Sequence, residues 1–240
     1  VSDFALDSAV FLQLGSFANI QVGTPPAPGD WRGLQLLENT NDRNVDIAVE
    51  RETGNATVTG TNETPATAQY LGELAPDEKS ADDNRRLGLE VRGALNRPSD
   101  LDVYTFQAVA GTEVWLDIDR TSHALDTVLE LIDGNGHVLG RSNDSIEEAQ
   151  DPELLFSDPT LSEPLAINPL GKSDADAQDL WTTNPHDAGM RVVLPGPAGL
   201  TNTYYVRVRS GSERLGDLSA GLTTGVYHLQ IRLRELDEVA

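Results

Sequence analysis

Hydrophobic and polar residues alternate along most of the chain from residue 86 onward. Residues 113–119, for example, place Val114, Leu116 and Ile118 on one face of an extended segment. The same period of two runs through residues 86–91, 102–108, 126–133, 204–210 and 225–235. Alternation with this period is typical of antiparallel strands that have one buried and one solvent-facing side. The pattern therefore predicts an all-β chain.

Glycine-containing segments separate the predicted strands. Residues 108–113 (AVAGTE) and 133–138 (DGNGHV) favour tight hairpin connections, because glycine adopts the left-handed backbone conformation that such turns need. Short strands joined in this way predict a jelly-roll-like antiparallel β-sandwich. Short helical turns are compatible with residues 66–70 and 147–150.

Two regions depart from this rhythm. Residues 1–60 contain strand-like stretches and are interpreted as a strand-rich N-terminal extension. This extension is a small domain, the end of a preceding domain, or a set of strands added to the main sheet. Residues 143–190 are acidic, contain proline and exceed the length of an ordinary loop. We therefore expect the main domain over residues 61–240, with one long inserted loop.

The chain is strongly acidic. Its 240 residues include 17 Lys and Arg against 39 Asp and Glu, which gives a formal net charge of -22. This charge argues against partners such as nucleic acid or anionic membranes and favours divalent cations, although solvated acidic faces without a partner are the alternative. The absence of cysteine excludes disulfides and thiolate metal sites. No apolar run is long enough to insert into a membrane, and the chain is interpreted as a piece of a longer protein.

Two carboxylates lie one residue apart at Asp100 and Asp102. Residues i and i+2 of a strand share a face, so both side chains point the same way. Carboxylates this close resist joint ionisation unless a cation or hydrogen-bond donors compensate them. Calcium binds several such oxygen atoms, so a calcium site is one hypothesis. The alternative is that both residues cap a turn by accepting bonds from backbone N–H groups.

A second group of oxygen ligands surrounds one predicted hairpin. It contains Asp126, Asp133, Asn143 and Asp144, and we predict a weaker second calcium site from these residues. The alternative is that the segment DGNG forms a turn for backbone reasons alone. No metalloprotease or serine-hydrolase motif occurs, so we predict that the chain is not an enzyme.

Two aromatic residues are candidates for ligand binding. Trp115 and Tyr205 alternate out of phase with the apolar residues of their strands, so they are expected to face away from the core. An outward aromatic ring serves as a platform for a sugar or a peptide. The alternative is that such a ring packs beneath a loop.

Five segments in a fixed order make residues 62–235 resemble the bacterial pre-peptidase C-terminal domain. They are NETPATAQYLGEL (62–74), VRGALNRPSDLDVYTFQAVAGTEVWLDID (91–119), LDTVLELIDGNGHVLGRSNDS (125–145), NTYYVRVRS (202–210) and TTGVYHLQI (223–231). The resemblance implies a non-catalytic sandwich, similar to the collagen-binding domains of this family, of the kind found in large secreted multidomain bacterial proteins. It also implies calcium ligands at Asn62 and Glu63 together with Asp100 and Asp102. The calcium-binding relatives carry glutamates just before the asparagine, where this chain has none.

These considerations predict a non-catalytic module of a larger secreted or surface protein, located outside the cell or on its surface. The module would act in adhesion, assembly or spacing, with calcium as its candidate cofactor. Its partners would be a protein or polysaccharide ligand, or neighbouring copies or domains of the parent protein. The alternative is a targeting domain that brings a secreted protease or glycosidase to a protein fibre or polysaccharide.

Overall fold

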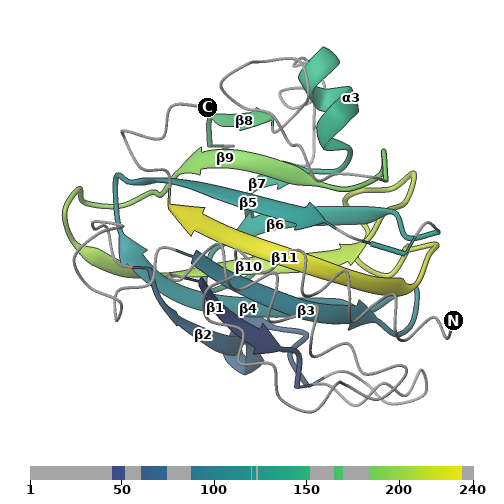
Figure 1. The fold of residues 1–240 in the computed structure, drawn as a ribbon, viewed down its shortest axis with the longest axis horizontal. Helices are drawn as coiled ribbons and strands as arrows, with labels where there is room; N and C mark the ends of the chain where they lie inside the picture. Colours follow the sequence, from purple (N-terminus) through teal and green to yellow (C-terminus); the bar gives the residue numbers. More distant parts are fainter. Residues whose placement is uncertain are drawn as a thin grey trace, which may run out of the picture. The chain divides into compact units, whose positions relative to one another are not determined.

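A computed structural model describes residues 45–51, 61–74, 88–119, 121–122, 124–151, 165–169 and 184–233. In these ranges the chain is almost entirely β-structure, arranged as two stacked sheets (Figure 1). The strands predicted for residues 1–44 and 52–60, and most of the predicted insertion, lie outside the described residues. Among the described residues, no helix is long and apolar enough to cross a membrane.

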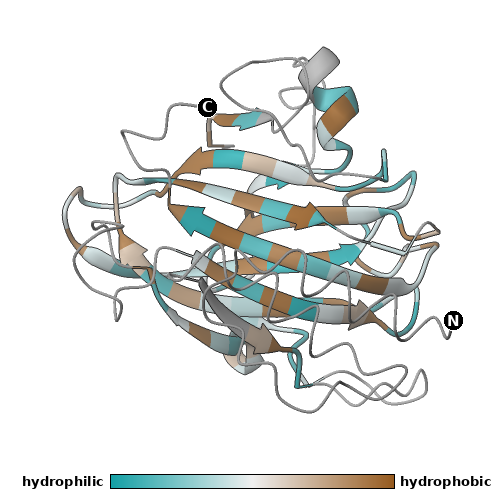
Figure 2. Ribbon diagram, viewed as in Figure 1, coloured by the Kyte–Doolittle hydropathy of each residue, from teal (hydrophilic) through white to brown (hydrophobic). Residues whose placement is uncertain are grey.

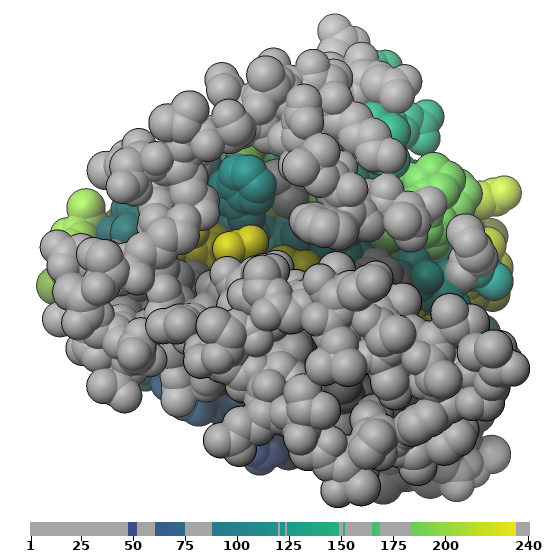
Figure 3. All heavy atoms as spheres, in the orientation of Figure 1, coloured from purple at the N-terminus to yellow at the C-terminus, as the bar shows by residue number. Residues whose placement is uncertain are grey.

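The first sheet, sheet A, has six strands in the order β1-β3-β11-β5-β9-β8. Their bounds are β1 (Val45–Val49), β3 (Gly88–Leu95), β5 (Glu113–Asp119), β8 (Ile167–Pro169), β9 (Gly189–Val193) and β11 (Gly225–Leu233). β11 runs antiparallel to both β3 and β5. In Figure 3, which shows the molecule in the orientation of Figure 1, described atoms of β11 are visible in yellow. The edge strand β1 precedes residue 60, so this part of the N-terminal segment adds a strand to the sheet.

The second sheet, sheet B, has five strands in the order β2-β4-β10-β6-β7. Their bounds are β2 (Gln69–Glu73), β4 (Leu101–Val109), β6 (Thr127–Ile132), β7 (Val138–Ser142) and β10 (Thr201–Ser210). β10 runs antiparallel to β4 and β6, as predicted. β2 runs parallel to β4, so the prediction of a purely antiparallel sandwich was wrong for this edge. A parallel neighbour is possible because the chain between β2 and β4 first crosses to β3 in sheet A.

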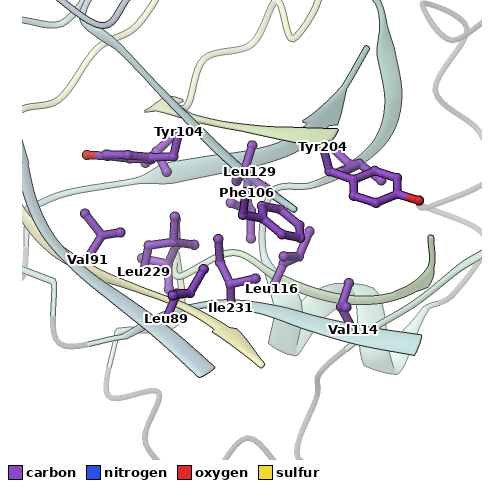
Figure 4. Packing of buried hydrophobic residues seen from close by; sticks show 14 of the residues in the cluster. Leu89, Val91, Tyr104, Phe106, Val114, Leu116, Leu129, Tyr204, Leu229 and Ile231 are labelled. Carbon is purple, nitrogen blue, oxygen red and sulfur yellow. The ribbon is translucent and has the colours of Figure 1, made fainter. Parts of the chain in front are cut away.

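The core lies between the two sheets. Side chains at alternate positions of each strand point into it, and Figure 2 shows the resulting alternation of hydrophobic and hydrophilic residues along the strands. Phe106 of β4 meets Leu116, Leu229 and Ile231 of sheet A across this layer (Figure 4). Burying each of these side chains stabilises the fold by about 1.5–3 kcal/mol relative to exposure. The predicted all-β sandwich is confirmed.

The predicted glycine turns form, and the predicted short helices form in part, because Gln69 and Tyr70 belong to β2 rather than to a helical turn. Gly111 and Gly136 have φ angles of 89° and 86°, which places both predicted hairpin turns in the left-handed region that favours glycine. A 3₁₀ turn, η1, spans Pro65–Thr67, and a short helix, α3, spans Ser145–Gln150. The insertion is not wholly loop, because its β8 pairs with β9 at the edge of sheet A.

The outward face of sheet B is not uniformly wet. The alternation in β10 predicted solvent-facing arginines, but Arg207 and Arg209 are only 4% and 1% exposed. All six residues of β6 are buried. The prediction of one solvent-facing side was therefore wrong at the centre of this sheet, because Glu130 of β6 lies between these arginines and neutralises part of their charge.

Candidate cation-binding sites

The predicted pair Asp100 and Asp102 lies at the start of β4, and both residues are 0% exposed. Asp102 alternates with the core residues Tyr104 and Phe106, so its side chain enters the space between the sheets. Oδ2 of Asp100 accepts a hydrogen bond from the backbone N–H of Asn96 at 2.7 Å. The other oxygen, Oδ1, of each aspartate is buried without a hydrogen-bond partner among the described residues.

Tyr227 connects Asp102 to sheet A. Its hydroxyl donates to Asp102 Oδ2 at 2.6 Å and lies 2.7 Å from the hydroxyl of Tyr104. Tyr227 of β11 pairs with Gly93 of β3, and a Cβ atom on Gly93 would lie 2.4 Å from the tyrosine ring. Glycine at this position therefore makes room for the ring whose hydroxyl reaches the aspartate.

A third carboxylate comes from Glu50, directly after β1. Its Oε2 accepts a hydrogen bond from the backbone N–H of Ala94 at 2.8 Å, whereas Oε1 is buried without a partner in the described ranges. The pKa of Asp102 is raised well above its ordinary value, first by burial and then by the side chain of Glu50. Asp100 adds a further repulsion. This part of the site therefore carries more negative charge than its surroundings compensate.

The predicted ligand Asn62 lies beside this group, and the predicted ligand Glu63 is otherwise engaged. Asn62 is 4% exposed, and its backbone oxygen accepts from the N–H of Val103 at 2.8 Å. Both polar atoms of its side-chain amide are buried without a partner among the described residues. Glu63 instead pairs with Arg97, whose Nη2 also lies 3.4 Å from Asp100 Oδ1.

Four buried oxygen atoms thus lack a hydrogen bond in this region of the described structure. We call them the oxygen cluster: Glu50 Oε1, Asn62 Oδ1, Asp100 Oδ1 and Asp102 Oδ1. Three of the four residues were predicted from the sequence. Glu50 was missed because it is remote in sequence and lies outside the motifs of the resembled family. Only the pairing of β1 with β3 brings it here.

The side chain of Gln69 holds the backbone on both sides of Glu50. Its Nε2 donates to the backbone oxygen of Val49 at 3.0 Å, and its Oε1 accepts from the N–H of Arg51 at 3.0 Å. Gln69 belongs to β2 of sheet B, whereas β1 belongs to sheet A. This clamp therefore connects the edges of the two sheets next to the oxygen cluster.

The second predicted group is divided by the structure. Asp126 and Asp144 come together with His186, and the ligand atoms of these three residues all lie within 4.8 Å of one another. No other group of three Asp, Glu or His residues in the described ranges meets this condition. Asn143 adjoins the group, because its Nδ2 donates to Asp144 Oδ2 at 2.6 Å.

Asp133 has a different role. It lies in the turn between β6 and β7, where its Oδ1 accepts from the backbone N–H groups of Asn135 and His137, each at 2.8 Å. Its Oδ2 lies 3.0 Å from Nδ1 of His137. Although desolvation acts to raise the pKa of Asp133, these hydrogen bonds lower it to about 2. This carboxylate is satisfied locally, as the turn interpretation of DGNG proposed.

Glu130 forms a charge cluster that the sequence did not reveal. On the outward side of β6, its carboxylate accepts hydrogen bonds from Nε of Arg141 at 2.7 Å, Nε of Arg207 at 2.6 Å and Nη2 of Arg209 at 3.0 Å. Burial acts to raise its pKa, but the positive charges of Arg209 and Arg207 outweigh it and the pKa is lowered. The strand register brings these residues side by side, whereas in the sequence they resemble ordinary polar positions of a wet face.

The two aromatic candidates lie on different sheets. Trp115 is on β5 of sheet A and Tyr205 on β10 of sheet B, each out of phase with the core residues of its strand. Both side chains are half-buried. The two rings therefore face away from the core on opposite sides of the sandwich and do not form one binding surface.

Comparison with known proteins gives no family assignment. No family model and no curated protein matches the chain. The crystal structure of Salmonella Typhimurium PliG, a periplasmic lysozyme inhibitor of g-type lysozyme, is 14% identical with a TM-score of 0.32, covering 70% of this chain and 100% of that one. Aeromonas hydrophila PliG, described in the same terms, is 11% identical with a TM-score of 0.27, covering 70% and 99%. A likeness at this level carries no inference about function.

Proposed function

We propose that this chain is a non-catalytic β-sandwich module of an extracellular or cell-surface protein, stabilised by calcium at the oxygen cluster. In that setting it would act in adhesion, assembly or spacing. The observation that carries the calcium proposal is the group of four buried oxygen atoms without hydrogen bonds among the described residues. Leaving a buried polar group unsatisfied costs about 1–3 kcal/mol, and more when the group is charged.

Turn capping accounts for only part of this arrangement. Asp100 Oδ2 does accept a backbone N–H, and so does Glu50 Oε2. The remaining oxygen of each carboxylate has no hydrogen bond among the described residues, and neither has the amide oxygen of Asn62. Of these atoms, Asp100 Oδ1 has an ion-pair contact, with Arg97 Nη2 at 3.4 Å. Oxygen atoms from carboxylates and an amide are the ligands that calcium prefers, and calcium tolerates irregular geometry. The ligand atoms of Glu50, Asp100 and Asp102 do not all lie within 4.8 Å of one another, so binding of one ion to all three requires these side chains to move closer together.

Among the described residues, positively charged side chains compensate little of the negative charge of the oxygen cluster. Arg97 approaches Asp100 but is shared with Glu63. Among the described residues, the hydrogen bond to Asp102 Oδ2 comes from the neutral hydroxyl of Tyr227. A divalent cation would remove the repulsion between Glu50 and Asp102 that contributes to the raised pKa.

The location of the cluster supports a structural rather than a catalytic role for the proposed ion. Asp100 and Asp102 are 0% exposed, so a substrate has no access to them. The cluster connects Glu50 after β1 with Asp102 in β4, and these elements belong to different sheets. Calcium would therefore fasten the edge strand β1 to the sandwich.

The experiment is thermal unfolding of the full chain in excess EDTA and then in millimolar calcium. Native-state binding at a calcium concentration 100-fold above Kd would add about 2.7 kcal/mol of stability. The double variant D100N/D102N should lose this gain, whereas D133N, which changes a locally satisfied carboxylate, should keep it. A wild-type melting temperature that does not respond to calcium would overturn the proposal, as would an equal response from D100N/D102N.

A further inference from the structure

We propose that Asp126, Asp144 and His186 form a second metal site, separate from the oxygen cluster, that takes a transition-metal ion such as zinc. The three residues come from different parts of the chain: Asp126 precedes β6, Asp144 precedes α3, and His186 precedes β9. Their ligand atoms nevertheless lie within 4.8 Å of one another. Metal–ligand bonds to nitrogen and oxygen are about 2.0–2.2 Å long, so two ligands of one ion lie at most about 4.4 Å apart. Side-chain shifts of a few tenths of an ångström are therefore enough for a single ion to touch all three residues.

The backbone of His186 is fixed from two directions. Its N–H donates to Asn184 Oδ1 at 3.2 Å, and its carbonyl oxygen accepts from both N and Oγ1 of Thr127, each at 3.2 Å. The ring extends from this anchor, and its Nδ1 lies 3.1 Å from Asp144 Oδ1. The backbone of His186 is therefore fixed, and its side chain, which is 59% exposed, places Nδ1 against the carboxylate.

Asp126 is fixed as closely. Its N–H donates to Oγ1 of Thr223 at 3.1 Å, and its carbonyl oxygen accepts from the N–H of Gly211 at 2.9 Å. Its carboxylate packs directly on Gly211, where an added Cβ atom would lie 2.2 Å from Oδ1. This same Oδ1 is buried and has no hydrogen-bond partner among the described residues. Asp126 Oδ1 is therefore held in place while its hydrogen-bonding capacity is unused in this part of the structure.

The neighbour Asn143 orients the third ligand and leaves a further oxygen unused. Its Nδ2 donates to Oδ2 of Asp144, and its own N–H donates to Glu148 Oε1 at 2.8 Å. Asp144 Oδ1 consequently faces His186. Oδ1 of Asn143 is buried without a partner within the described ranges. Two buried oxygen atoms beside an imidazole therefore lack the bonds that buried polar atoms normally make.

The ligand types decide which cation fits. Calcium and magnesium bind oxygen atoms almost exclusively, whereas imidazole nitrogen combined with carboxylates suits zinc and related divalent ions. The presence of His186 therefore separates this group from the calcium site predicted around the same hairpin. Burial raises the pKa of Asp126, and repulsion from Asp144 raises it further; a cation bound to both carboxylates would relieve that repulsion.

The chain contains a matched control for this site. His137 and Asp133 form a second histidine–aspartate pair, with Nδ1 3.0 Å from Oδ2. That pair is not part of a group of three ligands in the described structure, and its carboxylate is satisfied by backbone N–H groups. The variant H137Q therefore removes an imidazole beside a carboxylate while leaving the proposed site intact.

The test is a titration of the full chain with cobalt(II), followed by its visible absorption, and with zinc, followed by calorimetry, both in saturating calcium. Wild type and H137Q should bind one equivalent with equal affinity. H186Q and the isosteric D126N should each weaken binding by at least about tenfold, with unchanged far-ultraviolet circular dichroism. Equal affinities in wild type, H186Q and D126N, or no binding to wild type, would overturn the inference.

The outcome is independent of the calcium proposal. D100N/D102N should retain cobalt binding even if it loses the calcium response. Conversely, H186Q should retain the calcium-dependent rise in melting temperature. Loss of cobalt binding in D100N/D102N with the fold intact would contradict two separate sites.

Discussion

Two buried carboxylates on opposite faces of sheet B have opposite electrostatic surroundings. Glu130 points outward and Asp102 points toward the core, and both side chains are 0% exposed. Glu130 is surrounded by three guanidinium groups, which lower its pKa against the effect of burial. Burial raises the pKa of Asp102 well above its ordinary value, and the neighbouring Glu50 and Asp100 raise it further. The hydroxyl of Tyr227 donates a hydrogen bond to it but carries no charge.

The difference shows how a fold can compensate a buried negative charge. At Glu130 the compensating cations are part of the chain, and the strand register brings them together. At Asp102 the charged neighbours are other acids, and the hydrogen bond that it accepts comes from the neutral hydroxyl of Tyr227. We therefore expect stability to depend on pH and on calcium through Asp102, whereas the charge of Glu130 is compensated by arginines of the chain.

The largest expected effect comes from removing the carboxylate that holds the arginines. The variant E130Q keeps the shape of the side chain but leaves Arg141, Arg207 and Arg209 without their shared counter-ion. Breaking a buried ion pair by removing one partner costs about 3–5 kcal/mol. We expect a loss of this size in the free energy of unfolding, measured by urea denaturation.

The control for this variant is E90Q. Glu90 pairs with Arg92 at 3.2 Å and lies 3.5 Å from Nδ1 of His228, in a more exposed position with 14% of its side chain accessible. Pairs near the surface contribute at most about 1 kcal/mol. A loss in E130Q no greater than that in E90Q would show that the arginine cluster does not depend on Glu130.

The pH dependence of stability sharpens the same contrast. Because the pKa of Asp102 is raised above its ordinary value of 3.8, the folded state retains a proton that the unfolded state releases. Stability from this group is full below that pH and falls as pH rises, by up to about 1.4 kcal/mol per unit. Glu130 has the opposite sign, because its lowered pKa gives stability above its ordinary value of 4.5 that is lost in acid.

The measurement is urea unfolding in EDTA at a series of pH values. D102N should remove a loss of stability that wild type shows above pH 3.8. E130Q should remove a loss that wild type shows below pH 4.5. If both variants shifted the curve in the same direction, the two carboxylates would not be compensated in opposite ways.

Much of the fold was predictable because it depends on local alternation. The core faces of β5 and β11 follow directly from residues 113–119 and 225–235, and the glycine turns follow from the backbone freedom of that residue. The parallel pairing of β2 and the burial of Arg207 were not predictable. Both depend on which strands become neighbours, and a period of two contains no information about strand order.

The candidate sites show the same division. Asp100 and Asp102 were predictable from their spacing on one strand, and Asp126, Asn143 and Asp144 from their position around one hairpin. Glu50 and His186 were missed because each reaches its site only through pairing with a distant segment. Asp133 is separate from the second group because of the conformation of its turn, in which backbone N–H groups donate hydrogen bonds to its carboxylate.

The smallest expected effect tests how Glu50 is held at the oxygen cluster. Q69A removes both hydrogen bonds that connect β2 to the backbone of Val49 and Arg51. Because these bonds are exposed to solvent, we expect a loss of about 1 kcal/mol in the free energy of unfolding in EDTA. With Glu50 less firmly positioned, Q69A should also require more calcium than wild type to reach half of its full stabilisation.

The control for this variant is Q107A. Gln107 lies on the adjacent strand β4 and lacks this connection, so Q107A should match wild type in both measurements. A calcium requirement in Q69A equal to that of Q107A would show that β1 reaches the cluster without the clamp, through its pairing with β3 alone.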